Sequence, residues 1–308
     1  MKSLVEYIKE SLIFEGGHSI DGATPIRGDL AKEVADNIMN QLKTEFHIEC
    51  AALGSVGKKG KNQTSGDIDI AVQMSWDDKD KLISFIKTNI KDCIFGNIVD
   101  YLNVFNIGYK YKEDNKDKIV QVDFMFVDDI EWAKFVYFSP NFLKNESQFK
   151  GAWRSTLLRG IVACTPTENI NKKYKTEYFN NGDIKSFWKF TFSQSQGLFA
   201  DHKTYEGKNK QLKNPKTLKE DREYISKNID EILHMCLGKD ASRDDCNSYE
   251  TLLNFLSSDR YEFRSVEQLE KIKEWLFDNT DLLREATDKV INDAKQLFNN
   301  TIKYIKTL

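Results

Sequence analysis

Residues 53–74 read LGSVGKKGKNQTSGDIDIAVQM, and this stretch decides the fold that we expect. From residue 67 onward the side chains alternate strictly, with Asp67 and Asp69 on one face and branched apolar residues on the other. Successive side chains of a β-strand point to opposite faces. The pattern therefore predicts a half-buried strand over residues 67–74 that presents both carboxylates on the same side.

A glycine and a serine end the apolar segment that precedes this strand. Residues 47–54 are short and apolar, which predicts another strand, and Gly54-Ser55 closes it. Gly54 lets a backbone approach a phosphate without a Cβ clash, and Ser55 adds a hydroxyl beside free backbone N–H groups. The glycines and lysines of residues 56–66 predict a loop that can fold over a bound nucleotide.

A third carboxylate lies on a later predicted strand. Residues 119–127 read IVQVDFMFV and pair, in our prediction, with residues 101–111 as an antiparallel hairpin. Asp123 has apolar neighbours on both sides, and burying a carboxylate without a partner is costly. A metal ion would supply that partner, and a salt bridge would do so equally. Three carboxylates on adjacent strands suit two Mg²⁺ ions, which prefer oxygen ligands.

The order Gly-Ser, loop, Asp-Ile-Asp-Ile and a later aspartate resembles the signature of the DNA polymerase β-like nucleotidyltransferases. The resemblance covers residues 30–128. It implies that Asp67, Asp69 and Asp123 are both the catalytic and the metal-binding residues, with Mn²⁺ as an alternative to Mg²⁺. It also implies that Asp123 helps to polarise the acceptor hydroxyl. The nucleotide-binding residues that we assign are Gly54, Ser55, Lys58, Thr64, Ser65, Lys150 and Arg154.

A weaker likeness extends to nucleotidyltransferases encoded by bacteriophages. It rests on Glu15-Gly16-Gly17, on residues 122–125, on Ser139-Pro140 and on residues 150–154, which read KGAWR. Lys150 and Arg154 could contact phosphate through charge-assisted hydrogen bonds, although surface ion pairs explain them equally well.

The fold class that we expect is α+β. Residues 1–168 are expected to form the nucleotidyltransferase domain, with a mixed or antiparallel sheet and flanking helices. Residues 169–308 are expected to form a mainly helical domain on the acceptor side, because most of residues 221–308 have helical periodicity. The lysine-rich residues 203–219 are interpreted as a charged linker, with nucleic-acid binding as the alternative.

Composition excludes several classes of protein. The 308 residues carry a formal net charge of −3, so no global basic field favours nucleic acid. Five cysteines without C-x-x-C spacing argue against a disulfide framework and a zinc site. No apolar run reaches the roughly 20 residues of a membrane span. We therefore expect a protein of the cytoplasm, or of the host cytoplasm if a phage encodes it; its oligomeric state is not readable.

The function that we expect is transfer of a nucleoside monophosphate from an NTP to a hydroxyl, with release of pyrophosphate. The acceptor is left open between an RNA or tRNA 3′ end, a DNA end, a protein hydroxyl and a small molecule, with a nucleic-acid 3′ end favoured. One alternative is a non-catalytic module that binds a nucleotide or nucleic acid. Another is a toxin or antidefence protein that modifies tRNA, which would share the chemistry.

Overall fold

Two structural units make up the chain. The computed structural model describes residues 20–56, 59–91, 93–100, 103–137, 149, 151–193, 196–205, 217–280, 283 and 286–308. The first unit comprises the chain up to Ala152 together with the short segment 281–285, and the second comprises Trp153–Thr280 and Ala286–Leu308. The boundary falls near the start of helix α5 (Gly151–Cys164), upstream of the boundary at residues 168–169 that the sequence suggests.

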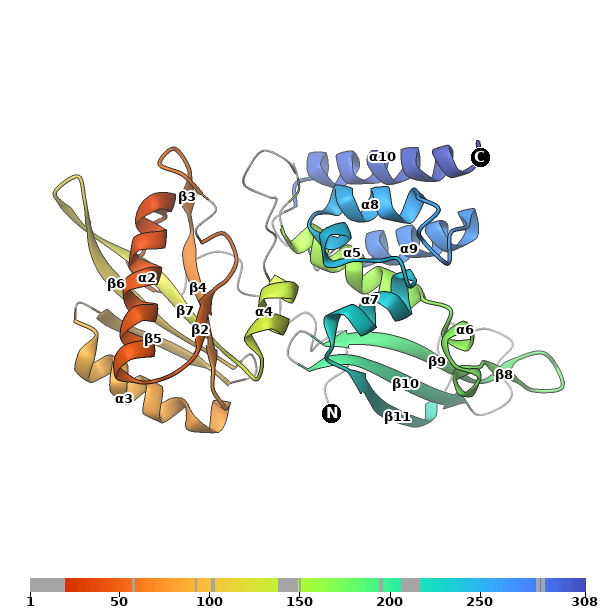
Figure 1. The fold of residues 1–308 in the computed structure, drawn as a ribbon, viewed down its shortest axis with the longest axis horizontal. Helices are drawn as coiled ribbons and strands as arrows, with labels where there is room; N and C mark the ends of the chain where they lie inside the picture. Colours follow the sequence, from red (N-terminus) through yellow and green to blue (C-terminus); the bar gives the residue numbers. More distant parts are fainter. Residues whose placement is uncertain are drawn as a thin grey trace. The chain divides into compact units, whose positions relative to one another are not determined.

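A five-stranded mixed sheet forms the framework of the first unit (Figure 1). Its order is β2-β4-β7-β6-β5, in which β4 and β7 run parallel and the other neighbours run antiparallel. The hairpin expected for residues 101–127 is present as β6 and β7. The strands are β2 (Cys50–Ala52), β4 (Asp67–Gln73), β5 (Cys93–Val99), β6 (Val104–Glu113) and β7 (Lys116–Val127).

Two helices, α2 (Gly28–Glu45) and α3 (Lys79–Asn89), pack on one face of this sheet. The apolar sides of the helices pack against branched and aromatic residues of the strands. Ile38 of α2, Ile68 of β4 and Phe124 of β7 belong to this core and are all fully buried. Residues 30–46 carry apolar side chains at helical spacing, which is the pattern of a helix that packs one side against a core. Because strand side chains alternate, the aspartates of β4 and β7 are left on the opposite face.

Helix α4 (Ile130–Tyr137) packs against that opposite face. Its Ala133 shares a small apolar cluster with Leu53 and with Ala71 of β4. The carboxylate of Asp129 accepts a hydrogen bond from the Trp132 backbone N–H at 3.0 Å and so caps the first turn. Ala71 continues the face that begins with the two aspartates, so α4 contacts the C-terminal half of that face.

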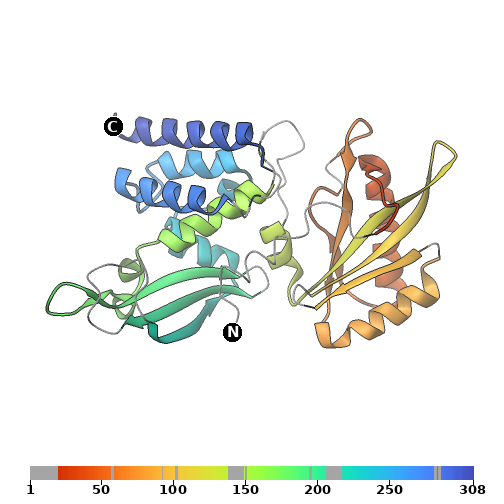
Figure 2. The same ribbon diagram turned by 180° about the vertical axis from the view of Figure 1, so that it is seen from behind.

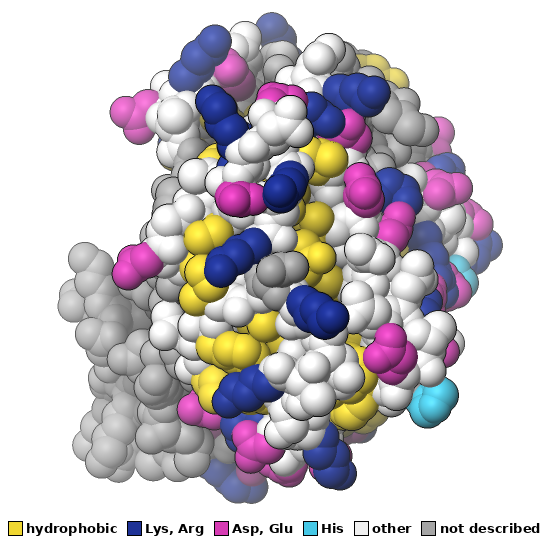
Figure 3. Space-filling view, turned by 90° about the vertical axis from the view of Figure 1, so that its left-hand side faces the viewer, with side chains coloured by type: hydrophobic (Ala, Val, Ile, Leu, Met, Phe, Trp, Pro, Cys, Tyr) yellow, Lys and Arg dark blue, Asp and Glu magenta, His cyan; other side chains and the backbone are white. Residues whose placement is uncertain are grey.

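The edge strand β5 exposes apolar side chains. Ile94, Phe95 and Ile98 are all exposed, and the ladder with β6 shifts register between Phe95 and Ile98. Lys87 places its ammonium group 5.0 Å from the Phe95 ring centre. Hydrophobic side chains lie between lysines and arginines over much of this side of the first unit (Figure 3). The sequence analysis missed β5, because its apolar alternation breaks at that register shift.

The second unit combines a sheet with helices (Figure 2). Its four antiparallel strands have the order β11-β10-β9-β8. The strands are β8 (Glu177–Tyr178), β9 (Ile184–Ser193), β10 (Gly197–Tyr205) and β11 (Thr217–Ser226). The helices are α5, α6 (Thr167–Ile170), α7 (Ile229–Leu237), α8 (Tyr249–Ser257), α9 (Val266–Asp278) and α10 (Asp288–Ile305).

The second unit contains a four-stranded sheet beside its helices, a feature that the expectation of a mainly helical domain over residues 169–308 did not include. Residues 221–226, which were expected to be helical, belong to β11, and a helix begins only at Ile229. The segment expected to be a linker contributes Lys203 to β10 and Lys219 to β11. Charged edge strands have weak alternation, so pairing with β10, rather than the local pattern, decides the conformation of β11.

Two further expectations concern helices and membranes. The apolar spacing of residues 1–14 predicts a helix, and that segment lies outside the described residues. Among the residues that the structure describes, no helix combines the length and apolarity that crossing a bilayer requires.

Candidate metal centre

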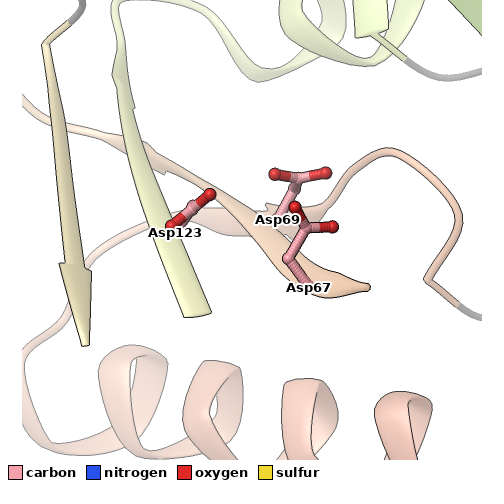
Figure 4. A group of neighbouring side chains, drawn as sticks. All are labelled: Asp67, Asp69 and Asp123. Carbon is pink, nitrogen blue, oxygen red and sulfur yellow. The ribbon is translucent and has the colours of Figure 1, made fainter. Parts of the chain in front are cut away.

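Three aspartates meet on the open face of the first sheet. The parallel ladder between β4 and β7 places Asp69 directly beside Asp123, and Asp67 lies two residues before Asp69 on the same face. Oxygen atoms from all three carboxylates lie within 4.8 Å of one another. Figure 4 shows the three side chains projecting from the two strands toward one region. The three aspartates could therefore hold a metal ion between them.

Asp123 is the buried member of the group. Its exposed fraction is 1%, whereas Asp67 and Asp69 are partly exposed. Burial, followed by the nearby charge of Asp67, raises the pKa of the Asp123 carboxyl to about 7, and a hydrogen bond from Gln121 acts in the opposite direction. A divalent cation would reverse this balance, because it stabilises the ionised carboxylate.

Gln121 is a site residue that the sequence analysis missed. Its amide Nε2 donates to both carboxylate oxygens of Asp123, at 2.9 and 3.1 Å, and the residue is 2% exposed. The ladder also places Gln121 directly beside Asp67. The alternation of residues 119–127 puts Gln121 on the face of Asp123, and that spacing was the signal available in the sequence.

Asn106 extends the polar row onto β6. It lies beside Asp123 in the antiparallel ladder, and it is fully buried. Its Oδ1 accepts a hydrogen bond from the backbone N–H of Asn97 at 2.7 Å, where β5 shifts register. Asn106 therefore connects the irregular edge strand to the strand that carries the buried aspartate.

Gly54 lies against the second aspartate. It has a positive φ of 60°, and a Cβ atom at this position would overlap Oδ2 of Asp69. The Leu53 backbone N–H donates to the Asp69 carbonyl at 2.9 Å, which fixes the turn against β4. Glycine is thus required at residue 54 both by its backbone conformation and by the carboxylate beside it.

The loop after Gly54 is tied back to the start of β4. The hydroxyl groups of Ser55 and Ser65 share a hydrogen bond of 2.8 Å, and Ser65 is fully buried. Residues Thr64–Ser65 form β3, which pairs with β1 (Ile26–Arg27). The structure therefore places Ser55 next to Ser65, and Ser65 precedes Asp67 by two residues.

Two cationic side chains, Lys59 and Arg27, lie beside Thr64 of the β1–β3 pair. Thr64 is exposed, its carbonyl accepts a hydrogen bond from Lys59 Nζ at 2.9 Å, and Arg27 is its partner in the ladder with β1. Arg27 is held by Asp29, through Nε to Oδ1 at 2.7 Å. The sequence analysis did not select Arg27 for nucleotide binding, because nothing local in the sequence pairs it with Thr64.

The remaining predicted nucleotide-binding residues are not part of this group. Lys58 and Lys150 lie outside the described residues. Arg154 lies in the second unit, where it is 3% exposed and its Nε donates to the Cys246 carbonyl at 2.6 Å. The guanidinium therefore has a hydrogen-bond partner inside the packing of that unit, and this burial argues against the assignment of Arg154 as a phosphate ligand.

No protein-family model matches the chain, and a search among curated proteins finds no match either. The chemistry of the site therefore follows from its own residues and their geometry.

Proposed function

We propose that the chain is a Mg²⁺-dependent nucleotidyltransferase of the polymerase β-like kind, which transfers a nucleoside monophosphate from an NTP to a hydroxyl. The observation that carries the proposal is the convergence of Asp67, Asp69 and Asp123 from two parallel strands, with carboxylate oxygens within 4.8 Å of one another. A Gly-Ser turn lies beside them, as the motif of that superfamily requires.

The donor set supports magnesium. All three side chains offer carboxylate oxygens, which are the ligands that Mg²⁺ prefers, and Mn²⁺ accepts the same donors. The two neighbours that affect the pKa of Asp123 are Asp67 and Gln121, and neither is a cation. Bound there, divalent ions would neutralise phosphate charge and stabilise the leaving pyrophosphate.

The residues have distinct roles in the proposed reaction. The acceptor oxygen bonds to the α-phosphorus, the bond from that phosphorus to the bridging oxygen of the β-phosphate breaks, and pyrophosphate leaves with the electron pair. Asp67 and Asp69 would hold the ions. Asp123 would polarise the acceptor hydroxyl and receive its proton, a role that suits a carboxylate placed directly beside Asp69 in the β4–β7 ladder.

We assign the binding of the NTP triphosphate to the turn at Gly54. Without a Cβ, the Gly54 backbone lies directly against the Asp69 carboxylate, and the paired hydroxyl groups of Ser55 and Ser65 tie the turn to the segment before β4. Lys59 and Arg27 add positive charge next to Thr64 at the end of the same loop. This part of the site supplies the hydrogen-bond donors that phosphate oxygens need.

Turnover with each NTP tests the proposal. Purified protein is incubated with Mg²⁺, each of the four NTPs labelled at the α-phosphate, and total cellular RNA, DNA or protein. Pyrophosphate release and transfer of label to one fraction are expected, and both should stop in Asp69→Asn. Asp117→Asn is a matched control, because Asp117 lies on the same face of β7 as Asp123 but is 86% exposed at the hairpin.

Two results would contradict the proposal. Equal pyrophosphate release by wild type and Asp69→Asn would remove the aspartates from the chemistry. Retained NTP binding without any Mg²⁺-dependent pyrophosphate release would instead favour a non-catalytic binding module.

A further inference from the structure

The sheet of the second unit has two different faces. One face packs against η3 (Lys172–Tyr174), whose Tyr174 ring lies 5.0 Å from Trp188 and 5.7 Å from Phe190. Phe190 and its ladder partner Ala200 are fully buried on this face. No described helix lies in front of the other face when the sheet is seen from behind (Figure 2).

That other face carries two pairs of aromatic rings. Phe187 of β9 and Tyr205 of β10 are stacked, with ring centres 5.8 Å apart and an interplanar angle of 14°. Phe199 of β10 and Tyr224 of β11 are ladder partners and meet edge to face at 5.6 Å. Tyr224 is 55% exposed. Four rings from three strands thus share one sheet face.

Cations lie among these rings. The guanidinium of Arg222 lies 5.2 Å from the centre of the Phe199 ring, and its Nε and Nη2 donate to the two carboxylate oxygens of Asp201 at 2.7 and 3.1 Å. Lys203 is the ladder partner of both Phe187 and Glu220, and it forms an ion pair with Glu220 at 2.9 Å.

The charges on this face are mixed, and Arg222 is the more exposed of the two cations. Asp201 is 2% exposed, whereas the side chain of Arg222 above it is 45% exposed. The carboxylate therefore fixes the plane of the guanidinium from below, and the cation is presented outward. A guanidinium held flat beside aromatic rings is a surface on which a planar, electron-rich ring can stack.

We propose that this face binds single-stranded nucleic acid. We name it the aromatic face and define it by Phe187, Phe199, Tyr205, Tyr224, Lys203 and Arg222. Unpaired bases stack on exposed aromatic rings and on guanidinium planes, and nearby cations contact the phosphates. A duplex hides the faces of its bases, so the aromatic face discriminates against it.

The binding site stands on the second unit alone. Only the role of the bound strand as the hydroxyl acceptor rests on the proposed function. Binding can therefore be measured with EDTA present, which removes the divalent ions on which transfer depends. Binding without transfer would count against the proposed function and leave the aromatic face intact.

Fluorescence anisotropy with labelled oligonucleotides tests the proposal. The full chain is titrated into single strands of poly(U) and poly(dT) of about 15 nucleotides, the upper range for one binding site, and into a duplex of the same length. Single strands should bind more tightly than the duplex. Tyr224→Ala should weaken single-strand binding at least about fivefold, the loss expected for one stacked base, and Tyr224→Phe should retain it.

Tyr304→Ala is the matched control, since Tyr304 belongs to the same unit and is 54% exposed on α10. It should bind like wild type. Single strands that bind no better than the duplex, or Tyr224→Ala that binds like Tyr304→Ala, would overturn the proposal. A change in sedimentation with Tyr224→Ala, together with unchanged oligonucleotide binding, would also overturn it and identify a contact between copies of the chain.

Discussion

Gly54 and Asp69 are in such close contact that a Cβ atom on the glycine would overlap Oδ2 of the carboxylate. The contact joins the turn that follows β2 to the strand that carries two of the three clustered acids. Its geometry explains why the turn needs glycine: the backbone has a positive φ of 60°, and the space for a side chain is already occupied.

Gly54→Ala should therefore displace the Asp69 carboxylate. We expect Mg²⁺ affinity to fall about 10- to 100-fold, as it does when groups that orient metal ligands are changed. Isothermal titration calorimetry measures the affinity. Gly60→Ala is the control in the same loop, because a Cβ there meets nothing within 4 Å. Equal affinities in the two variants would show that the contact does not position Asp69.

The buried carboxyl of Asp123 should make the metal-free protein sensitive to pH. Its pKa is about 7 when folded, against the ordinary value of 3.8, so between these values the folded state keeps a proton that the unfolded state has released. The free energy of unfolding should then fall as pH rises from about 4 to about 7. At about 1.4 kcal/mol per pKa unit, the total is at most a few kcal/mol.

Asp123→Asn should remove this slope. Urea denaturation in EDTA, carried out between pH 4 and pH 8, measures it, and the variant should be more stable than wild type at pH 8. Saturating Mg²⁺ should raise the stability of wild type more than that of the variant. A wild-type profile that rises from pH 4 to pH 7 would contradict the assigned cause.

Gln121 should tune metal binding through Asp123. Its two hydrogen bonds lower the pKa of that carboxyl, so Gln121→Leu should raise the pKa and shift the pH midpoint of Mg²⁺ binding upward. At pH 7 the affinity should be about tenfold weaker or more. Gln73→Leu, on the same face at the exposed end of β4, is the control. A loss that is equal at pH 7 and pH 9 would indicate structural damage instead.

Arg154 should act on stability and not on nucleotide binding. Arg154→Met removes the donor to the Cys246 carbonyl inside the second unit, and we expect a loss of about 1–3 kcal/mol in the free energy of unfolding. Arg243→Met, which breaks an exposed ion pair with Asp230, should cost less than about 1 kcal/mol. An increase in KM for NTP with unchanged urea stability would restore Arg154 as a phosphate ligand.

The local sequence pattern was enough to predict that Asp67 and Asp69 lie on the same face of a strand. A period of two is a property of the strand itself, so the spacing of Asp67 and Asp69 determines that they share a face wherever β4 pairs. The same reasoning predicted the β6–β7 hairpin, whose strands have apolar residues at a period of two.

Tertiary structure alone decided which residues surround those aspartates. The approach of Asp123 to Asp69 depends on the register of the parallel β4–β7 ladder, and a slip of one residue would turn Asp123 to the opposite face. Three other features also depend on contacts between segments far apart in the sequence, which local periodicity does not encode. They are the contact of Gly54 with Asp69, the burial of Arg154 and the pairing of β11 with β10. The sequence by itself determined the donor groups and the shared face of Asp67 and Asp69, and long-range packing determined the position of Asp123 and the distances, burial and pKa of the site.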